Sequence, residues 1–454
     1  MLHNNCLLTV LYVVSLCSSG LWPFATVGWP QDEGRLDSDL ARYYPASVLE
    51  TGYDILFFWV ARMVTLGLEL TNQLPFHTIY LHGLVRDASG QKMSKTKGNV
   101  IDPINTIEQY GADALRFSLV TGSTPGQDLP LSLEKIEASR NFVNKLWNLG
   151  KAVQAVSNAA SPNGRRSVID RSILSYPERY ILAKCDATTH EATAHLEAMR
   201  FGEAGQVLQD FVWNNLADWF VEVAKLRHRN GDSQQAATSA VVLVLVWKTV
   251  LRCLHPFLPF VSEALWQLIR EDNEAESISV ADWPNPLLNE DAEACERFEV
   301  LRDTVRRVRN ARSELGVEPG KKIAIVVRGS SSLCCGLREE GAVLAALCKC
   351  EEDIRFLSAT DDPPSNALRL VVRGELDVFL PQGSLLDRNK ELGRIERQRD
   401  RLASDLAVLE GRLANAAYRA KAPATLVKEV QAKADELRRQ LVALQKCRED
   451  LDLH

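Results

Sequence analysis

The longest regular pattern in the chain is helical and covers its middle. Between about residues 132 and 315, apolar side chains recur at steps of three and four, the spacing of a helix that buries one face. Two such series are Trp213, Leu216, Phe220, Val223 and Ala224, and Leu251, Leu254, Leu258 and Val261. Proline-rich punctuation, DWPNP at 282–286, separates the helices. The pattern predicts a bundle of packed helices.

The last seventy or so residues carry a narrower apolar pattern, typical of a coiled coil. Pro423, in the segment AAYRAKAPAT at 416–425, separates two helical runs because proline cannot continue a helix smoothly. Arg399 and Arg448 each interrupt one run. The apolar seams are Leu392, Ile395, Leu402, Leu406, Leu409 and Leu413, then Val427, Val430, Ala434, Leu437, Leu441, Leu444 and Leu451. This pattern predicts an antiparallel hairpin of two helices.

Strand-like runs occur on both sides of the bundle. HTIYLHGLV at 77–85 follows a helix-like run at 54–70, which indicates an α/β region from 18 to about 126. KIAIVVR at 322–328 and LRLVVR at 368–373 predict a second, smaller α/β module.

An apolar run from Cys6 to Leu16 is too short to span a bilayer, and no Lys or Arg precedes it. A signal peptide, a buried strand and an unrelated start all remain open for this run. No other run is apolar for the roughly 18 residues that a membrane helix needs, so we expect a soluble protein without a membrane partner.

Composition adds two constraints. The 454 residues suffice for about three domains, and the net charge of −6 means that local basic faces would have to hold any nucleic acid. The ten cysteines are scattered, and neither Cys334-Cys335 nor Cys348-x-Cys350 has a neighbouring histidine or CxxC spacing. We therefore favour apolar packing in a reducing compartment over a zinc site.

Candidate chemistry concentrates in RDASGQKMSKTKGNVIDP, residues 86–103, which places Lys92, Lys95 and Lys97 between Gly90 and Gly98. Ammonium groups on a flexible loop suit a phosphate chain whose charge shifts during a reaction. A lysine-rich surface loop can equally be merely solvated.

The string KMSKT, within D-x-x-G-x-KMSK-T-x-GN, resembles the KMSKS signature of class I aminoacyl-tRNA synthetases. Other segments narrow this resemblance to the valyl-tRNA synthetase family, from about residue 18 to the C-terminus. They are GLWPFATVGWP (20–30), LETGYDILFFWVARM (49–63), YLHGLVRD (80–87), NKLWN (144–148), ADWFVEVAK (217–225), LHPFLPFVSEALWQ (254–267) and NARSELGVEPGKK (310–322). The FFW residues and the terminal hairpin argue against isoleucyl or leucyl specificity, and the zinc-binding tail of an isoleucine enzyme is absent.

The resemblance implies a mixed, mainly α fold in five parts. Residues 1–17 are an unrelated segment, and 18–130 are the C-terminal part of a Rossmann-like catalytic domain with the KMSKT loop. Residues 131–318 form a helical anticodon-binding domain, 319–383 a small α/β module, and 384–454 a coiled-coil arm that binds tRNA.

The function implied by the resemblance is ATP-dependent activation of L-valine to valyl-adenylate and transfer to tRNA(Val), with Mg²⁺ accompanying ATP. Lys92 and Lys95 are the expected catalytic contacts to phosphate, with Ser94 as a further donor. His82 and Asp87 fall near the adenosine, although His82 is equally credible as a structural histidine.

The expected valine pocket comprises Trp22, Asp54, Ile55 and Trp59, where indoles and an aliphatic wall make a dry slot. Asp54 would pair with the ammonium group of valine. Aromatic residues in an apolar helix are otherwise ordinary core.

Two basic regions are candidates for tRNA contact. On the predicted helix through residues 301–312, we expect the apolar and basic faces to separate, so that arginines face RNA or simply solvent. The candidates there are Arg302, Arg306 and Arg309, with Arg307 and Arg312. Those near the hairpin tip are Arg412, Arg419 and Lys421, with Lys428.

The sequence departs from the family in two respects: it has no His-x-Gly-His signature and no editing domain before GLWPF. We therefore expect a truncated form, impaired in valine activation, and a monomer of the cytoplasm or an organelle. The alternative is a non-catalytic tRNA-binding protein that retains the anticodon-binding domain and the arm.

Overall fold

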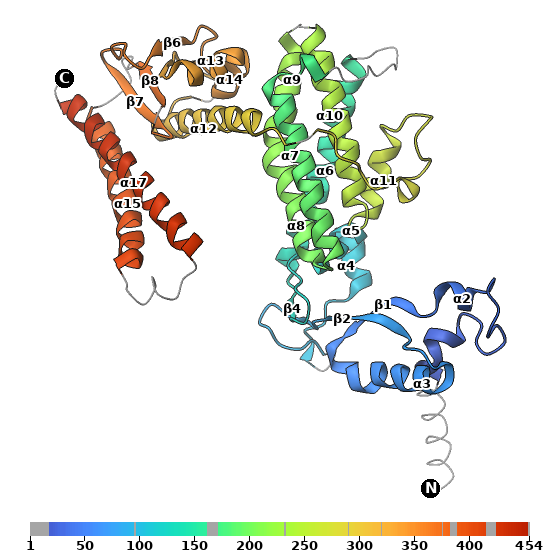
Figure 1. The fold of residues 1–454 in the computed structure, drawn as a ribbon. Coiled ribbons are helices and arrows are strands. Elements are labelled where there is room, and N and C mark those ends of the chain that lie inside the picture. The colour runs from blue at the N-terminus through green and yellow to red at the C-terminus, as the bar shows by residue number, and fades with distance from the viewer. Residues whose placement is uncertain are drawn as a thin grey trace. The chain divides into compact units, whose positions relative to one another are not determined.

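The computed structural model describes residues 18–94, 97–160, 171–230, 233–288, 290–318, 320–374, 376–381, 388–414 and 424–452. The apolar run Cys6–Leu16 lies outside them. Two compact units make up the chain. Unit 1 comprises Met1–Gly164, Cys185–Trp219 and Leu243–Leu287, and unit 2 comprises Arg165–Lys184, Phe220–Val242 and Leu288–His454. The fold is mixed and mainly α, as the sequence predicts (Figure 1).

The first part of unit 1 is α/β. A helical segment at 18–25 and α2 (Asp39–Tyr43) precede β1 (Ala46–Gly52), which pairs in parallel with β2 (Phe76–His82). Between these strands the predicted helix begins with two irregular turns, a 3-10 turn at Tyr53–Ile55 and a π turn at Leu56–Val60, before α3 (Ala61–Thr71). The predicted strand at 77–85 divides into β2 and the short β3 (Val85–Arg86), which pairs with β4 (Leu129–Pro130).

The helical region begins with α4 (Pro103–Tyr110), α5 (Ala112–Val120) and α6 (Leu133–Ala160). It continues through η4 (Arg171–Ile173), α7 (Tyr176–Glu197), α8 (Phe201–Phe211), the π-helical η5 (Val212–Phe220), α9 (Val221–Asn230), α10 (Ser233–Leu254), α11 (Pro259–Gln267) and η6 (Ile278–Val280). Phe117 of α5 stacks on Phe142 of α6 with ring centroids 5.2 Å apart. A Cβ atom at Gly150 would lie 2.4 Å from the Leu265 side chain, so glycine is what lets α6 approach α11 this closely.

A buried carboxylate joins α5 to α11 within unit 1. Helix α11 begins after Leu258, which supplies no side-chain cap, so its first amide groups need another acceptor. Asp113 of α5 provides it: its Oδ2 accepts from Val261 N at 2.7 Å and its Oδ1 from Phe260 N at 3.3 Å. Burial raises the pKa of Asp113, although these amide donors oppose the shift. The first helices after the lysine-rich loop are thereby tied to α11 in the helical region.

Among the described residues, α10 is the one helix long and apolar enough, by length and composition, to cross a membrane, over Gln234–Leu254. Of its most apolar window, 72% is buried inside the structure. A core helix has the same composition, so this feature is weak evidence for a membrane span.

Unit 2 carries the small α/β module predicted by the sequence. Helix α12 (Ala292–Glu314) leads to a four-stranded sheet in the order β6-β5-β8-β7, with β5–β6 parallel and the other pairs antiparallel. The strands are β5 (Val326–Gly329), β6 (Arg355–Ser358), β7 (Ala367–Val372) and β8 (Leu376–Pro381). Helices α13 (Ser331–Glu339) and α14 (Gly341–Cys348) connect β5 to β6.

The chain ends in the predicted hairpin of α15 (Arg388–Ala414) and α17 (Ala424–Asp452), which pack along each other. Ala434, one of the predicted seam residues, is fully buried between them. Arg438 of α17 forms an ion pair with Glu410 of α15, with Nη2 and Oε1 2.7 Å apart. Figure 1 shows the two helices side by side.

A buried ionic cluster holds unit 2 together. Arg227 of α9 pairs with Glu178 of α7 and, at 2.6 Å from Nη2 to Oε1, with Glu340, which lies between α13 and α14. Ser175 and Ser239 each accept from the Arg227 guanidinium and donate to Glu178. Burial raises the pKa of Glu340, and the positive charge of Arg227 opposes this shift. One guanidinium therefore links three bundle helices to the small module.

We predict that Arg227→Ala lowers the free energy of unfolding of unit 2 by about 3–5 kcal/mol, because it leaves two carboxylates buried without a cation. The matched control is Arg297→Ala, which removes a partly exposed pair with Glu339 and should cost only about 0–1 kcal/mol. Urea unfolding, followed by a probe in α12, measures both. Equal costs for the two variants would contradict the role assigned to the cluster.

Candidate functional site

The carboxyl ends of β1 and β2 bring two predicted site residues together. Gly52 ends β1 opposite His82 in the register of the parallel pair. A Cβ atom at Gly52 would lie 2.7 Å from Asp54 Oδ1 and 3.5 Å from His82 Cε1. Asp54 and His82 thus meet over a glycine, at the strand ends where parallel sheets bind ligands. Sequence reasoning missed Gly52, although the GYD triplet was inside a quoted segment.

His82 is held in place by its own neighbourhood. Its Nδ1 lies 2.8 Å from the carbonyl oxygen of Gly83, and its Nε2 lies 3.2 Å from Glu50 Oε1. Both ring nitrogens therefore have protein partners. These contacts agree with the interpretation of His82 as a structural histidine.

The side chains of the other predicted pocket residues, Trp22, Ile55 and Trp59, are exposed to solvent or only partly buried. Trp59 is partly buried and packs against the cluster of Val60, Met63 and Phe76. Ile55 is exposed, and Trp22, on the helical segment at 18–25, keeps 64% of its surface exposed. The dry slot that the sequence predicts for an isopropyl group is therefore not closed by these side chains in this structure.

The lysine-rich loop is organised by the carboxylate of Asp87. Its Oδ1 accepts from Ser89 N at 3.0 Å, Ser89 Oγ at 2.8 Å and Gln91 N at 2.8 Å. Its Oδ2 accepts from Asn99 Nδ2 at 2.8 Å. These donors, with Asn99 first, lower the pKa of Asp87 to about 2. Asp87 is thus engaged within the loop, and Asn99 is a site residue that sequence reasoning missed.

A second carboxylate anchors the base of the loop. Asp128 accepts from Leu84 N at 2.8 Å, from Arg86 Nε, and from the hydroxyl of Tyr53 at 3.2 Å. These donors, with the Leu84 amide first, lower the pKa of Asp128. Arg86 in turn forms an antiparallel bridge with Lys92. Asp128 therefore connects the loop to Tyr53, the residue that precedes Asp54.

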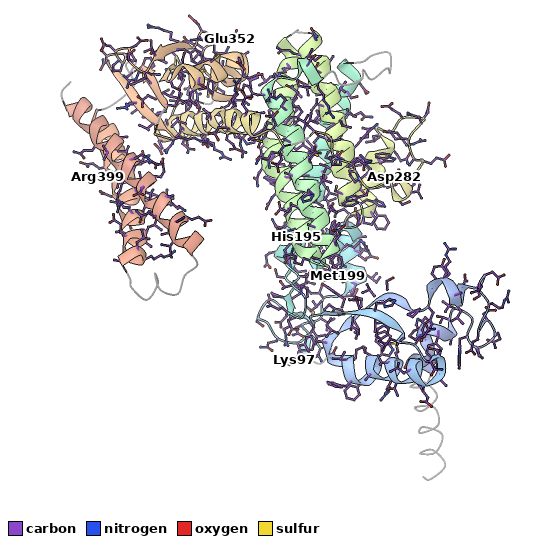
Figure 2. The ribbon with its side chains drawn as sticks, viewed as in Figure 1. Lys97, His195, Met199, Asp282, Glu352 and Arg399 are labelled. Carbon is purple, nitrogen blue, oxygen red and sulfur yellow. The ribbon has the colours of Figure 1, made fainter. Side chains whose placement is uncertain are left out.

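Two lysines of the loop, Lys92 and Lys97, belong to the described residues, and both are exposed. Lys97, which marks the loop in Figure 2, contacts Gln91 Oε1 with its Nζ at 3.4 Å. Ser94 N donates to Asn99 Oδ1 at 2.9 Å. Lys95, the other predicted phosphate contact, lies outside the described residues.

The basic helix α12 corrects one sequence expectation. Arg302 and Arg312 are buried, so apolar and basic faces do not separate as predicted. Arg302 Nη1 donates to the Tyr180 hydroxyl at 2.9 Å and to Glu299 Oε1 at 2.7 Å, while Arg312 donates to three backbone carbonyls, those of Glu318, Lys321 and Lys349. Both guanidinium groups thus form hydrogen bonds inside unit 2, and Arg302 is buried where RNA cannot contact it.

Of the arginines predicted to contact tRNA, Arg306 and Arg309 on α12 and Arg412 on α15 are exposed. Arg306 lies 3.7 Å from Asp303 Oδ1, and Arg309 Nε donates to the Leu347 carbonyl at 2.8 Å. Arg419 and Lys421 lie outside the described residues. Lys428, on α17, is exposed.

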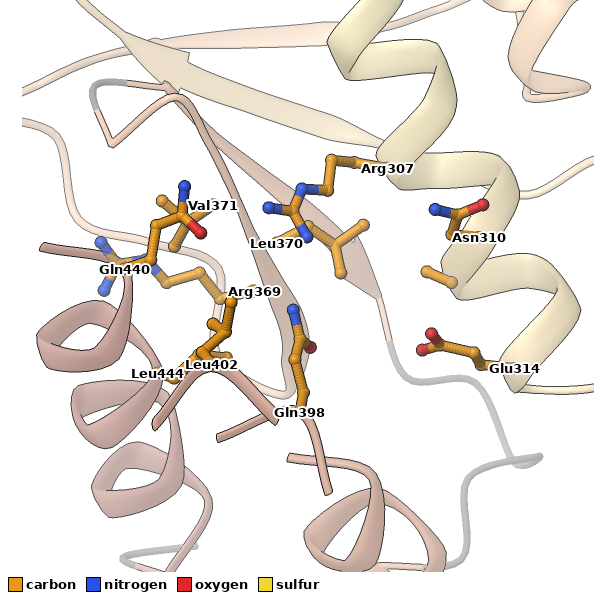
Figure 3. Close-up of a pocket in the computed structure, with 11 residues that line it drawn as sticks. Arg307, Asn310, Glu314, Arg369, Leu370, Val371, Gln398, Leu402, Gln440 and Leu444 are labelled. Atoms are coloured by element: carbon orange, nitrogen blue, oxygen red, sulfur yellow. The ribbon is translucent and has the colours of Figure 1, made fainter. Parts of the chain in front are cut away.

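A solvent-open hollow lies where α12, β7 and the two arm helices meet within unit 2. Figure 3 shows Arg307 of α12 facing it, together with Gln398 of α15 and Gln440 of α17. Arg369 also lines it and is paired with Asp377 at 2.9 Å. Its guanidinium and amide groups suit hydrogen-bond acceptors such as phosphate oxygens, but the lining also includes Glu314 and apolar side chains such as Leu402 and Leu444.

The described parts of the chain contain no candidate metal site. No group of three His, Cys, Asp or Glu side chains converges there. The described cysteines are all free, and burial raises the pKa of the Cys185 and Cys253 thiols.

Three family models match successive parts of the chain. Residues 15–132 match tRNA synthetases class I (I, L, M and V), residues 178–327 the anticodon-binding domain of tRNA ligase, and residues 387–452 the valyl tRNA synthetase tRNA binding arm. The three matches follow the same order as the α/β region, the helical region and the hairpin described above.

Curated relatives cover most of this chain. It is 38% identical over 431 residues to a chloroplastic/mitochondrial valine–tRNA ligase of Arabidopsis thaliana and 40% identical over 430 residues to the valine–tRNA ligase of Geobacillus kaustophilus (strain HTA426). Each alignment covers 92% of this chain but only 44% and 47% of the respective relative. The chain thus spans less than half the length of the relatives it matches.

Among solved structures, the Mycobacterium tuberculosis methionyl-tRNA synthetase in complex with methionyl-adenylate is 23% identical, with a TM-score of 0.47. That likeness covers 59% of this chain and 53% of the other, which is too partial to carry weight.

We predict that the Asp87 carboxyl group titrates near pH 2 in the folded chain, well below the value of about 3.9 for an ordinary aspartate. Because the folded pKa is depressed, the ordering of the loop by Asp87 is fully present above about pH 4 and is lost as the pH falls through about 2. Asn99→Ala should move the midpoint upward, since the Asn99 amide is the largest cause of the shift. Carbon-13 NMR of labelled aspartate measures the midpoint. A wild-type midpoint near 3.9 would contradict the bonding described for Asp87.

Proposed function

We propose that this chain serves the ATP-dependent joining of L-valine to tRNA(Val) in translation, because class I synthetase, anticodon-binding and valyl tRNA-binding-arm regions follow one another along it. The observation that carries the proposal is the order of these regions, at 38–40% identity to valine–tRNA ligases across nearly the whole chain. ATP, valine and tRNA(Val) are the proposed substrates.

The chemical step is in-line attack of the valine carboxylate on the α-phosphate of ATP, which forms valyl-adenylate and releases pyrophosphate. Lys92 and Lys95 would stabilise the charge on the departing phosphates, and Ser94 would add a hydroxyl donor. Positioning and charge stabilisation suffice for this step, without a covalent enzyme intermediate. Mg²⁺ would arrive on the phosphates of the nucleotide, and no step is assigned to a protein-held ion.

For valine recognition, Asp54 is the residue that the geometry supports best. Its carboxylate is exposed at the end of β1, beside His82, where it can receive the ammonium group of the amino acid. Trp22, Ile55 and Trp59 would supply apolar walls. Closing the slot around an isopropyl group would need Trp22 and Ile55 to become less exposed than they are here.

For tRNA, the exposed cations on α12 and α15 are the proposed contacts: Arg306, Arg309 and Arg412, with Arg419 and Lys421 as further sequence-based candidates. Each would neutralise a backbone phosphate rather than read a base. Since the chain is acidic overall, such local faces have to supply the attraction. We propose that the protein acts as a monomer, in the cytoplasm or in an organelle.

The test is filter binding of the 454-residue chain to tRNA(Val) and to a non-cognate tRNA across a salt series. We expect tighter binding of tRNA(Val), and an affinity for both RNAs that falls steeply between about 50 and 200 mM salt because counterions are released. The double variant Arg306→Ala/Arg412→Ala should weaken binding of both tRNAs and reduce the salt slope by about 1 per lost phosphate contact.

The matched control is Arg35→Ala, which removes an exposed arginine outside α12 and the arm and should leave binding unchanged. Equal affinity for the two tRNAs would overturn the proposed specificity. An unchanged slope in the double variant would remove Arg306 and Arg412 from the interface.

A further inference from the structure

One side chain connects the two limbs of the lysine-rich loop. Asn99 donates from Nδ2 to Asp87 Oδ2 at 2.8 Å, and its Oδ1 accepts from Ser94 N at 2.9 Å. A third, longer contact runs from Nδ2 to the Lys92 carbonyl at 3.4 Å. The start of the loop, its middle and its end therefore meet at Asn99.

The two oxygens of Asp87 have separate partners. Oδ1 takes the three donors of Ser89 and Gln91, and Oδ2 takes the amide of Asn99. Between Asp87 and Asn99 the chain turns at two glycines with positive φ, Gly90 at 78° and Gly98 at 66°, and no atom would obstruct a Cβ at either. Polar bonds therefore close the two turns, while Met93 between them packs against the apolar cluster of Leu115, Leu131 and Ile136.

Several backbone amides in the described part of the loop donate to acceptors inside it. Besides the amides bound by Asp87 and Asn99, Gly90 N donates to Asp87 O at 2.9 Å and Lys97 N donates to Ser94 O at 3.1 Å. Many phosphate-binding loops use backbone amides as the cradle. The amides named here already donate within the loop, and the point at which Lys92 leaves the loop decides what its ammonium group can reach.

We propose that Asp87 and Asn99 form a latch that positions Lys92 for the phosphate chain, although neither residue touches the phosphates. The identity of the anion rests on the proposed function. The latch itself rests only on the geometry of the loop. Both are positioning residues, and their removal should increase local opening of the loop without unfolding unit 1.

Exchanging the two side-chain types gives a sharp test. In Asp87→Asn, two amide NH₂ groups face each other, and in Asn99→Asp, two carboxylates do, so each single variant loses the bridge. In the double variant Asp87→Asn/Asn99→Asp, the new amide at 87 donates to the new carboxylate at 99. The amide oxygen at 87 still accepts from Ser89 and Gln91, and the carboxylate at 99 still accepts from Ser94 N. Every bond of the latch is thus rebuilt with the roles reversed, apart from the long contact to the Lys92 carbonyl.

Limited trypsin digestion reports on the opening, because the bonds after Lys92, Lys95 and Lys97 all lie inside the loop. We expect each single variant to raise the cleavage rate at these bonds roughly tenfold, and the double variant to return it to within about twofold of wild type. Asp102→Asn is the control, because it changes a neighbouring aspartate that caps α4 outside the latch. Unchanged melting temperatures show that the effect is local.

Single variants that cleave like wild type, or a double variant that cleaves like the singles, would overturn the latch. Binding of inorganic pyrophosphate by isothermal titration calorimetry is the second readout, with Lys92→Ala as the reference for a lost contact. The affinity should fall in the singles and recover in the double. If wild type and Lys92→Ala bind pyrophosphate equally, the phosphate role of the loop fails, and the cleavage rates still decide the latch on their own.

Discussion

The hydrogen bonds from the first amides of α11 to the Asp113 carboxylate are the constraint on which the arrangement of unit 1 depends. A helix that begins without its own cap leaves amide donors unsatisfied, and an acceptor supplied by another element fixes that element in place. Asp113 comes from α5, which directly follows α4 and the lysine-rich loop. The Phe117–Phe142 stack adds an apolar contact between α5 and α6. Together these contacts hold α5 against α6 and α11, and α5 is the second helix after the loop.

Carboxylates recur as organisers elsewhere in the chain, with different consequences. Asp87 and Asp128, which are accessible to solvent, accept several donors each and shape the loop and its base without large burial. Glu178 and Glu340 are buried and share the Arg227 cation, so they contribute to the stability of unit 2 and not to a ligand site. Partly exposed carboxylates thus order the loop, whereas the buried carboxylates link separate segments of unit 2.

Local sequence signals predicted the helices, the hairpin, the two α/β regions and the lysine-rich loop, because each depends on neighbouring residues. The contact of Asp113 with Val261 joins residues far apart in the chain, and no local pattern predicts it. Arg302 and Arg312 were assigned to a basic face for the same reason: the Tyr180 hydroxyl and the carbonyl of Lys349 that receive them come from distant segments. The sequence does not single out Asn99, because its role arises only when the folded loop brings its amide to Asp87 and Ser94. The valine and tRNA contacts stay predictions.

Native-state hydrogen exchange of unit 1 tests most directly whether Asp113 makes α5 and α11 one cooperative unit. We predict that the amides of Phe260 and Val261 and those of α5 exchange through one common opening, with the same free energy, and that Asp113→Asn lowers that free energy equally at both places. Exchange of α5 through a separate, easier opening in the wild-type chain, unchanged by Asp113→Asn, would contradict the account.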